Sequence, residues 1–122
     1  MNGIDYLADT NAFILLLDKH PSLKGLLTSS WHYSFITQIE LLCKFNINAS
    51  ETKQVKGLLN ICIKLTHNES INDIAIFLRQ QYKIKLPDAL IAATAPHYQL
   101  PLLTFDKGFK HIKDLDMIIL EM

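Results

Sequence analysis

YLADTNAFILLL, which runs from Tyr6 to Leu17, changes its pattern at Asp9. Before this acid, Tyr6 to Ala8 form a short apolar run that predicts a buried strand. After it, a leucine-rich segment from Asn11 to Lys19 predicts a helix, which Pro21 ends. The chain therefore opens with a strand that stops at an acidic residue and passes directly into a helix, as in the first half of a β–α–β unit.

Short apolar runs and helical patterns alternate along the rest of the chain. A second strand is predicted from Tyr33 to Ile36, followed by a helix from Gln38 to Phe45. In the middle of the chain we predict a helix that changes to a strand near Asn60 and an amphipathic helix from Ile71 to Tyr82. A helix from Leu86 to about Ala95 follows, with Pro87 at its first position and Pro96 at its end or kink. The last predicted elements are a strand from Leu102 to Phe105, a turn or short helix through Lys113, and a strand from Met117 to Leu120. This alternation predicts an α/β fold with a parallel sheet covered on both faces, and ligands of such sheets bind at the carboxyl ends of the strands.

Length and composition exclude several classes of protein. The 122 residues, 49% of them apolar and 20% charged, predict a single domain over residues 1–122 with a core of its own. The longest apolar run has six residues, Ala12 to Leu17, far short of the roughly 20 needed to cross a bilayer. With no secretory signal and only two cysteines, the expected location is the cytoplasm.

Four acidic residues follow predicted strands or open the helices after them. Each has an ordinary local explanation. Asp9 fits a helix cap, Glu40 completes a Thr-x-x-Glu capping box with Thr37, Asp88 suits the positive end of a helix dipole, and Asp106 precedes Lys-Gly as in a turn. None of the four indicates a function by itself.

The shared placement of these acids indicates a common site, because the carboxyl ends of parallel strands meet at one edge of the sheet. Two like charges about 4 Å apart repel by about 4 kcal/mol at an effective dielectric near 20, so gathered carboxylates need protons or a cation. Mg²⁺ or Mn²⁺ prefers oxygen ligands and works with carboxylates and phosphate oxygens, which suits the hydrolysis of phosphodiester bonds.

The same residues resemble the PIN-domain ribonucleases, in particular the VapC-type toxins of toxin–antitoxin pairs. The likeness covers nearly the whole chain. It is carried by four motifs in the order of that family: DTN at Asp9–Asn11, SFITQIEL at Ser34–Leu41, KLPDALIAATA at Lys85–Ala95 and LLTFDKGF at Leu102–Phe109. Pro96 departs from the family pattern, in which the helix usually runs on.

The resemblance implies a set of site residues and partners. Asp9, Glu40, Asp88 and Asp106 match the acidic quartet that holds one or two Mg²⁺ or Mn²⁺ ions, and Asn11 and Thr104 match polar positions that support it. It also implies a three-layer α/β/α fold with a five-stranded parallel sheet, a homodimer, an RNA substrate, and a VapB-type antitoxin whose C-terminal segment blocks the site.

We assign roles to this quartet as an expectation. Asp9 and Asp106 are expected to ligate the main metal, with Asp88 completing its shell or holding its waters. Glu40 is expected to orient or deprotonate the attacking water, or to hold a second ion. The expected RNA-backbone contacts are weaker assignments, since surface lysines are common: Lys83, Lys85, Lys107 and Lys110.

Other chemistries find little support in the sequence. The five histidines lack zinc-site spacing, and there is no GxSxG elbow, P-loop or GxGxxG motif. Two alternatives to a nuclease remain open. One is a PIN fold kept only for binding RNA or protein, and the other is a phosphoacceptor receiver domain, which normally has paired acids after its first strand where this chain has Asp9 alone.

Overall fold

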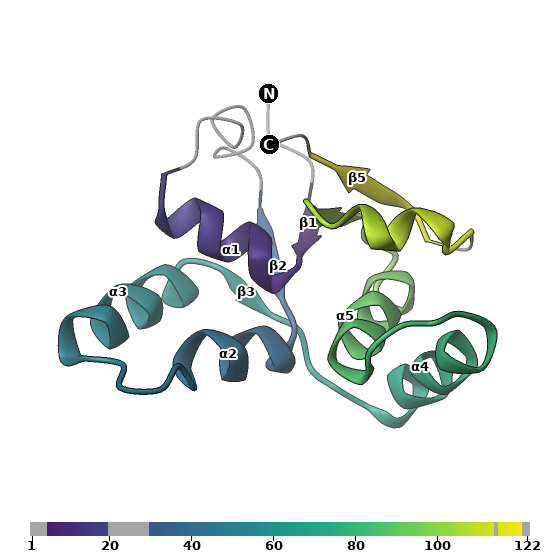
Figure 1. The fold of residues 1–122 in the computed structure, drawn as a ribbon, viewed down its shortest axis with the longest axis horizontal. Coiled ribbons are helices and arrows are strands. Elements are labelled where there is room, and N and C mark those ends of the chain that lie inside the picture. The colour runs from purple at the N-terminus through teal and green to yellow at the C-terminus, as the bar shows by residue number, and fades with distance from the viewer. Residues whose placement is uncertain (1–4, 20–29, 114, 121–122) are drawn as a thin grey trace.

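The computed structural model describes residues 5–19, 30–113 and 115–120. Within them the chain forms five strands and six helices (Figure 1). The strands are β1 (Tyr6–Ala8), β2 (Trp31–Tyr33), β3 (Ile63–Lys64), β4 (Leu102–Thr104) and β5 (Met117–Ile119). The helices are α1 (Thr10–Leu17), α2 (Phe35–Leu42), α3 (Ala49–Asn60), α4 (Glu69–Gln81), α5 (Leu86–His97) and the 3₁₀ helix η2 (Lys107–His111).

The strands form one parallel sheet in the order β3-β2-β1-β4-β5, with β1 at its centre. This confirms the predicted α/β/α fold with a five-stranded parallel sheet. Ala8 is in register with Leu103, and the amide of Asp9 donates to the carbonyl of Leu103 over 3.1 Å. The register therefore places Asp9, at the carboxyl end of β1, beside Thr104, the last residue of β4.

Two hydrophobic cores lie on the two faces of the sheet. Because successive residues of a strand point to opposite faces, Leu7 and Leu102 pack with α4 and α5, whereas Ala8 and Leu103 pack with α1, α2 and α3. Figure 1 shows α1 to α3 gathered on one side and the α4–α5 pair on the other. Phe13 of α1 anchors the second core through edge contacts with the rings of Trp31 at 5.2 Å and Tyr33 at 6.0 Å.

The α4–α5 pair brings Asp88 to the edge of the sheet. Helix α4 buries Ile71, Ala75 and Leu78 on one side, as its helical spacing predicts. Helix α5 buries a continuous run of small and branched residues from Ile91 to Ala95 between α4 and the sheet, and Asp88 lies in its first turn. The packing of α5 therefore fixes the position of Asp88 relative to the carboxyl ends of the strands.

Several predicted boundaries differ from the structure. The second strand is Trp31–Tyr33 and not Tyr33 to Ile36, because Ser34 caps α2 by accepting from the amide of Thr37. Thr37 is thus in the first turn of α2, and the predicted Thr37–Glu40 capping box is wrong.

Helix α5 starts where it was expected to, but differs from its prediction in the position of Pro87 and in its end. It begins at Leu86, so Pro87 is its second residue, where a missing N–H forfeits no helical hydrogen bond. Pro96 lies inside the last turn and α5 ends at His97, followed by Gln99 in the left-handed conformation (φ 57°). Helix α1 ends at Leu17, and Pro21 lies outside the described residues.

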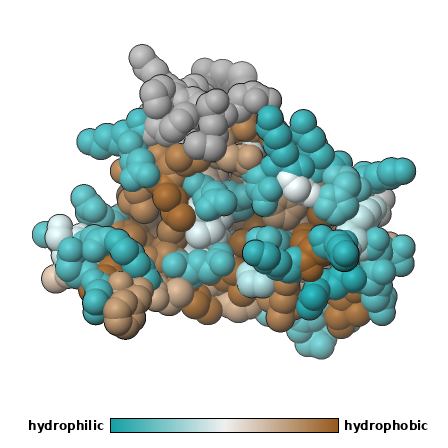
Figure 2. All heavy atoms as spheres, viewed as in Figure 1, coloured by the Kyte–Doolittle hydropathy of each residue, from teal (hydrophilic) through white to brown (hydrophobic). Residues whose placement is uncertain are grey.

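The visible surface mixes hydrophilic and hydrophobic residues (Figure 2). Several large apolar side chains are exposed among the described residues, with Phe45 at 87% the most exposed of them. None of the helices in the described part of the chain is both long and apolar enough to cross a membrane.

Candidate active site

Asp9 is a buried carboxylate at the junction of β1 and α1. It caps α1: its Oδ1 accepts from the amide of Ala12 over 2.8 Å, and its Oδ2 accepts from the hydroxyl of Thr104. Only 5% of the residue is exposed. The pKa of Asp9 is raised from 3.8 to about 6, chiefly by burial and to a lesser extent by the charges of Asp106 and Asp88, against the two hydrogen bonds that lower it. Asp9 is therefore a poorly compensated negative charge.

Thr104 links Asp9 to Asp106. The buried Thr104 hydroxyl donates to Asp9 and accepts from the backbone amide of Asp106 over 2.9 Å. Asp106 in turn caps η2, since its Oδ1 accepts from the amide of Gly108 over 2.7 Å. A Cβ atom at Gly108 would lie 2.9 Å from that same oxygen, so a larger residue there would displace the Asp106 carboxylate. The exposed Asp106 side chain is thus held beside the buried Asp9.

Asp88 adds a second perturbed carboxylate to this edge. It is half-buried in the first turn of α5. Its burial raises the pKa of Asp88, the neighbouring charges of Asp106 and Glu40 raise it further, and Lys85 lowers it. The four acids therefore interact with one another electrostatically, although they come from four different parts of the chain.

Glu40 reaches the cluster from α2. Its side chain is exposed, and its Oε1 accepts from the hydroxyl of Thr10 over 2.6 Å. Thr10 also lies 3.0 Å, oxygen to oxygen, from the hydroxyl of Thr37, which is fully buried. From the sequence, Thr37 is expected to be a cap, and Thr10 has no assigned role. The signal that could have identified them is their spacing, because Thr10 is next to Asp9 and Thr37 lies one helical turn before Glu40.

The donor set fits a hard divalent cation in its chemistry. All four acids offer carboxylate oxygens, and the raised pKa values of Asp9 and Asp88 are what a cation would offset. Within the described residues, however, no group of three or more Asp, Glu, His or Cys side chains is gathered closely enough to hold a metal ion in the present arrangement. For three of the acids to coordinate one ion, their side chains would have to move closer to one another.

A hollow of about 180 Å³ adjoins the acids. Asp88 and Asp106 line it together with Lys83, Lys85 and His111. His111, whose ring meets that of Tyr82 edge-on at 5.4 Å, was not singled out from the sequence, where it has no partner at metal-ligand spacing. Of the four predicted RNA-contact lysines, two thus lie at the hollow. Lys107 and Lys110 are exposed on η2 outside its lining, and Asn11 is exposed in the first turn of α1.

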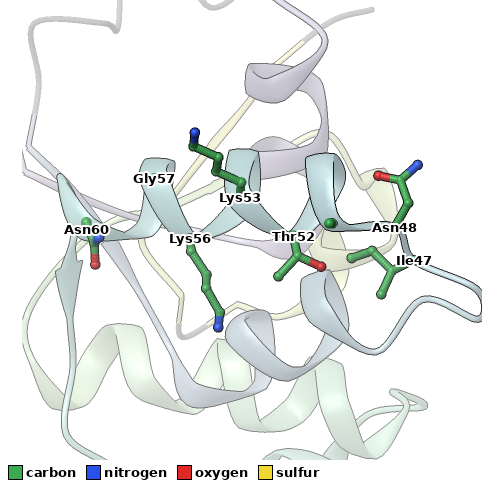
Figure 3. Close-up of a pocket in the computed structure, with 8 residues that line it drawn as sticks. Ile47, Asn48, Thr52, Lys53, Lys56, Gly57 and Asn60 are labelled. Carbon is green, nitrogen blue, oxygen red and sulfur yellow. The ribbon is translucent and has the colours of Figure 1, made fainter.

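Two other hollows lie on the α3 side of the molecule. One of about 740 Å³ contains none of the four acids and is lined by α3 and the residues before it, including Lys53, Lys56 and Asn60 (Figure 3). The other, of about 440 Å³, lies between α1, α2 and α3 and includes Glu40, Lys44 and Glu51.

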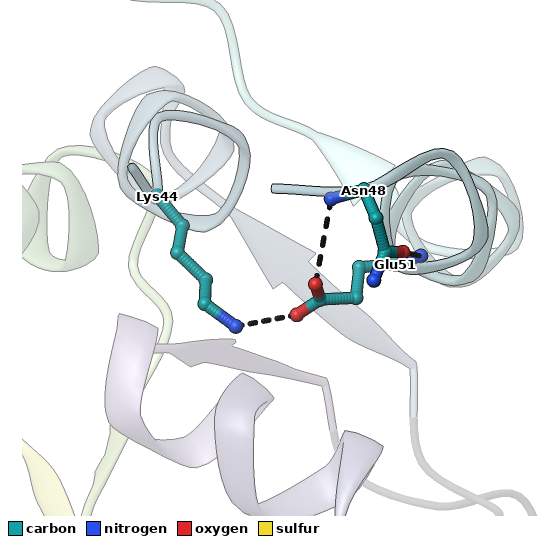
Figure 4. Close-up of polar contacts among 3 residues, drawn as sticks. All are labelled: Lys44, Asn48 and Glu51. Carbon is teal, nitrogen blue, oxygen red and sulfur yellow. Dashed lines mark hydrogen bonds and ion pairs between the residues drawn. The ribbon is translucent and has the colours of Figure 1, made fainter. Parts of the chain in front are cut away.

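The start of α3 carries its own carboxylate contacts (Figure 4). Glu51 and Asn48 form a capping box, in which the Asn48 side chain accepts from the amide of Glu51 over 2.7 Å. Glu51 also pairs with the Lys44 ammonium over 2.5 Å. This hydrogen bond with Lys44, and then that with Asn48, lower the pKa of Glu51.

The strand order β3-β2-β1-β4-β5, with acids at the carboxyl ends of neighbouring strands, defines an α/β/α protein of the PIN type. The PIN-domain family model matches residues 6–115, and the chain belongs to this family.

Solved structures with the same fold come from toxin–antitoxin systems. A chain of a toxin–antitoxin complex from Klebsiella pneumoniae is 30% identical, with a TM-score of 0.76 over 93% of this chain and 95% of that chain. A chain of VapBC-1 from nontypeable Haemophilus influenzae is 25% identical, with a TM-score of 0.79 over 95% and 98%. For a chain of VapBC2 from Rickettsia felis, bound to a promoter DNA fragment, the identity is 21% and the TM-score 0.79 over 97% and 100%. No curated protein matches the sequence. The neighbours are consistent with a VapC-type PIN toxin.

Proposed function

We propose that this chain, as a single PIN domain over residues 1–122, is a Mg²⁺- or Mn²⁺-dependent endoribonuclease and the toxin of a toxin–antitoxin pair. Membership of the PIN family, whose members are usually nucleases, supports the nuclease class. One observation carries the proposal furthest. Asp9 is buried with a pKa raised to about 6 and faces the charges of Asp88 and Asp106, an arrangement that a bound cation would relieve.

The positions of the four acids suit them to different roles in the proposed reaction. Asp9 and Asp106 would hold the metal, with Asp88 completing the shell or holding its waters, while Thr104 keeps Asp9 in place. When bound, the metal lowers the pKa of an attacking water and neutralises charge on the phosphate. Glu40, the exposed acid at the rim, would orient that water, accept its proton, or hold a second ion. Asn11 supports the cluster from the first turn of α1.

The substrate and partners follow the same proposal. Lys83 and Lys85 line the hollow beside Asp88 and Asp106, which suits contacts with the RNA backbone. Lys107 and Lys110 are weaker candidates on η2. Cleavage is expected to leave a 3′-hydroxyl and a 5′-phosphate. The toxin–antitoxin complexes among the structural neighbours support a VapB-type antitoxin as partner. We also propose a homodimer and a cytoplasmic location.

A growth experiment tests this function. The wild type, Asp9→Asn and the surface variant Asp73→Asn are expressed separately in a bacterial host, and total RNA is examined for discrete cuts. Growth arrest and cuts are expected from the wild type and Asp73→Asn only, because Asp73 is exposed on α4. Equal arrest and cutting by Asp9→Asn would defeat the catalytic assignment and leave the fold untouched.

A PIN fold that only binds RNA or protein is the second candidate. It is favoured by the absence, among the described residues, of acids gathered tightly enough to hold a metal. Calorimetric titration with Mn²⁺ separates the two functions. If the chain is a nuclease, the wild type is expected to bind Mn²⁺ and Asp9→Asn is expected to lose that binding. If it is a binding module, the wild type and Asp9→Asn are expected to give the same weak titration.

A further inference from the structure

Two threonine hydroxyls connect Glu40 to the segment that carries Asp9. The Oγ1 of Thr10 lies 2.6 Å from Oε1 of Glu40 and 3.0 Å from Oγ1 of Thr37. Thr10 directly follows Asp9 in the chain and opens α1, whereas Thr37 and Glu40 lie one turn apart on α2. The contact therefore joins two helices that follow neighbouring strands of the sheet.

The direction of hydrogen bonding through these atoms follows from the number of protons. An ionised carboxylate can only accept, so the Thr10 hydroxyl donates to Glu40. That uses the single proton of Thr10, and its oxygen must therefore accept from the hydroxyl of Thr37. Both donations point toward the carboxylate, and a bond to a charged acceptor is stronger than one between neutral groups.

The two threonines are themselves firmly placed. Thr37 is completely buried in the first turn of α2, which Ser34 caps. Thr10 is the first residue of α1, where Asp9 caps the helix through the amide of Ala12. Glu40, in contrast, is exposed, and a glutamate on a helix surface samples many rotamers unless a partner holds it. The Thr10 hydroxyl is a hydrogen-bond partner that can restrict the Glu40 side chain, and the Thr37 hydroxyl in turn bonds to Thr10.

We infer that Thr10 and Thr37 are positioning residues for Glu40. They hold its carboxylate in one orientation at the rim of the acidic cluster, with Thr10 in direct contact and Thr37 acting through Thr10. This inference rests on the proposed nuclease function, in which Glu40 orients or deprotonates the attacking water. A base that is misplaced or disordered loses much of its effect, because proton transfer needs hydrogen-bond contact with the water.

The chain offers closely matched variants. Valine has the shape of threonine without the hydroxyl, and serine keeps the hydroxyl, so Thr10→Val and Thr10→Ser separate the hydrogen bond from packing. Thr94→Val is the control for removing a buried threonine hydroxyl, since Thr94 is 2% exposed and its hydroxyl donates to Leu90 within its own helix, over 2.7 Å.

The main test is single-turnover cleavage of total bacterial RNA with Mn²⁺ over a range of protein concentrations, which separates the maximal rate from the half-saturating concentration. A positioned general base contributes about 10²–10⁴-fold. Thr10→Val is therefore expected to lower the maximal rate about 10- to 100-fold and to change half-saturation less than about threefold. Thr37→Val is expected to lose less, Thr10→Ser to restore most of the rate, and Thr94→Val to keep it.

A double-mutant cycle distinguishes positioning from a structural role. In a Glu40→Gln background, Thr10→Val is expected to lower the rate by less than about twofold, because the group that it holds is already inactive. An equal loss in both backgrounds would overturn the inference.

A second readout does not depend on activity. Three-bond NMR couplings of Glu40 in the metal-free protein are expected to report one dominant side-chain rotamer in the wild type and in Thr94→Val, and averaged rotamers in Thr10→Val. Unchanged couplings in Thr10→Val would overturn the inference even if no RNA is cut.

Asp9→Asn tells the two proposals apart. If it cleaves RNA like the wild type, the catalytic assignment of the acidic cluster fails whatever Thr10→Val does. If it loses cleavage while Thr10→Val keeps the maximal rate within about twofold, only the positioning of Glu40 by the threonines is wrong.

Discussion

Asp9 and Glu51 perform the same local task in two different surroundings. Each carboxylate accepts a backbone N–H at the start of a helix, Asp9 from Ala12 of α1 and Glu51 from Asn48 before α3. Glu51 is also paired with Lys44, and its pKa is lowered. Asp9 is buried beside two other acids, and its pKa is raised to about 6. A capping pattern alone therefore does not tell a structural acid from a functional one.

The difference lies in which charge state the fold favours. The pKa of Asp9 moves from 3.8 to about 6, which corresponds to a penalty of about 3 kcal/mol on its ionised form. Lys44 and solvent stabilise the charge of Glu51, whereas Asp9 has two neutral donors and two nearby anions. We expect a fold to keep such a penalised acid where a cation binds.

The largest expected difference between the two acids is in catalysis. Asp9→Asn is expected to lower the rate of RNA cleavage at least about 1,000-fold, since it removes a charged ligand of the proposed metal. Glu51→Gln is expected to keep the rate within about twofold, because Glu51 lies outside the acidic cluster. Both rates are measured on total bacterial RNA with Mn²⁺. A comparable loss in the two variants would show that Asp9 and Glu51 do not differ in function.

The next effect is on stability as a function of pH, without added metal. Because the folded-state pKa of Asp9 lies above its usual value, folding favours the protonated form. That contribution is complete below about pH 4 and is lost as pH rises through 6, so it changes stability by about 3 kcal/mol. The difference in unfolding free energy between wild type and Asp9→Asn is expected to follow this curve in urea denaturation.

Glu51 is expected to give a pH dependence of the opposite sign. Its lowered pKa means that folding favours the ionised form, so its contribution is present above its usual pKa of 4.5 and is lost as pH falls. The same urea series on Glu51→Gln measures it. Curves of the same sign for Asp9→Asn and Glu51→Gln would show that the surroundings do not separate the two acids.

Metal binding is expected to stabilise the proteins that retain Asp9. At Mn²⁺ concentrations ten times its dissociation constant, the wild type is expected to gain about 1.4 kcal/mol, seen as a rise in melting temperature. Glu51→Gln should show the same rise, and Asp9→Asn little or none. If Mn²⁺ raised the melting temperature of Asp9→Asn as much as that of the wild type, the ion would bind elsewhere.

The smallest effect concerns the cap of α3. Asn48→Ala removes the side chain that accepts from the amide of Glu51 and is expected to lower stability by about 1 kcal/mol. RNA cleavage should remain within about twofold of the wild type. A large loss of cleavage at unchanged stability would mean that the start of α3 takes part in the site.

The sequence by itself determined the local features of this protein. Strands ending at Asp9 and near Asp106, the amphipathic helix α4 and the switch from helix to strand near Asn60 follow from apolar periodicity and from residues next to one another in the chain. The error at Thr37 has the same origin, because Thr-x-x-Glu and the observed Ser34 cap are competing local patterns only three residues apart.

Only the tertiary structure decided what those residues meet. The strand order puts β4 beside β1, so that Thr104 bonds to Asp9 from 95 positions away in the chain. The contact from Thr10 to Glu40 spans 30 positions in the same way. Neither is encoded in a nearby pattern, because register and helix packing bring distant segments together. Burial by the fold and the nearby charges of Asp88 and Asp106, which also come from distant segments, distinguish Asp9 from an ordinary helix cap.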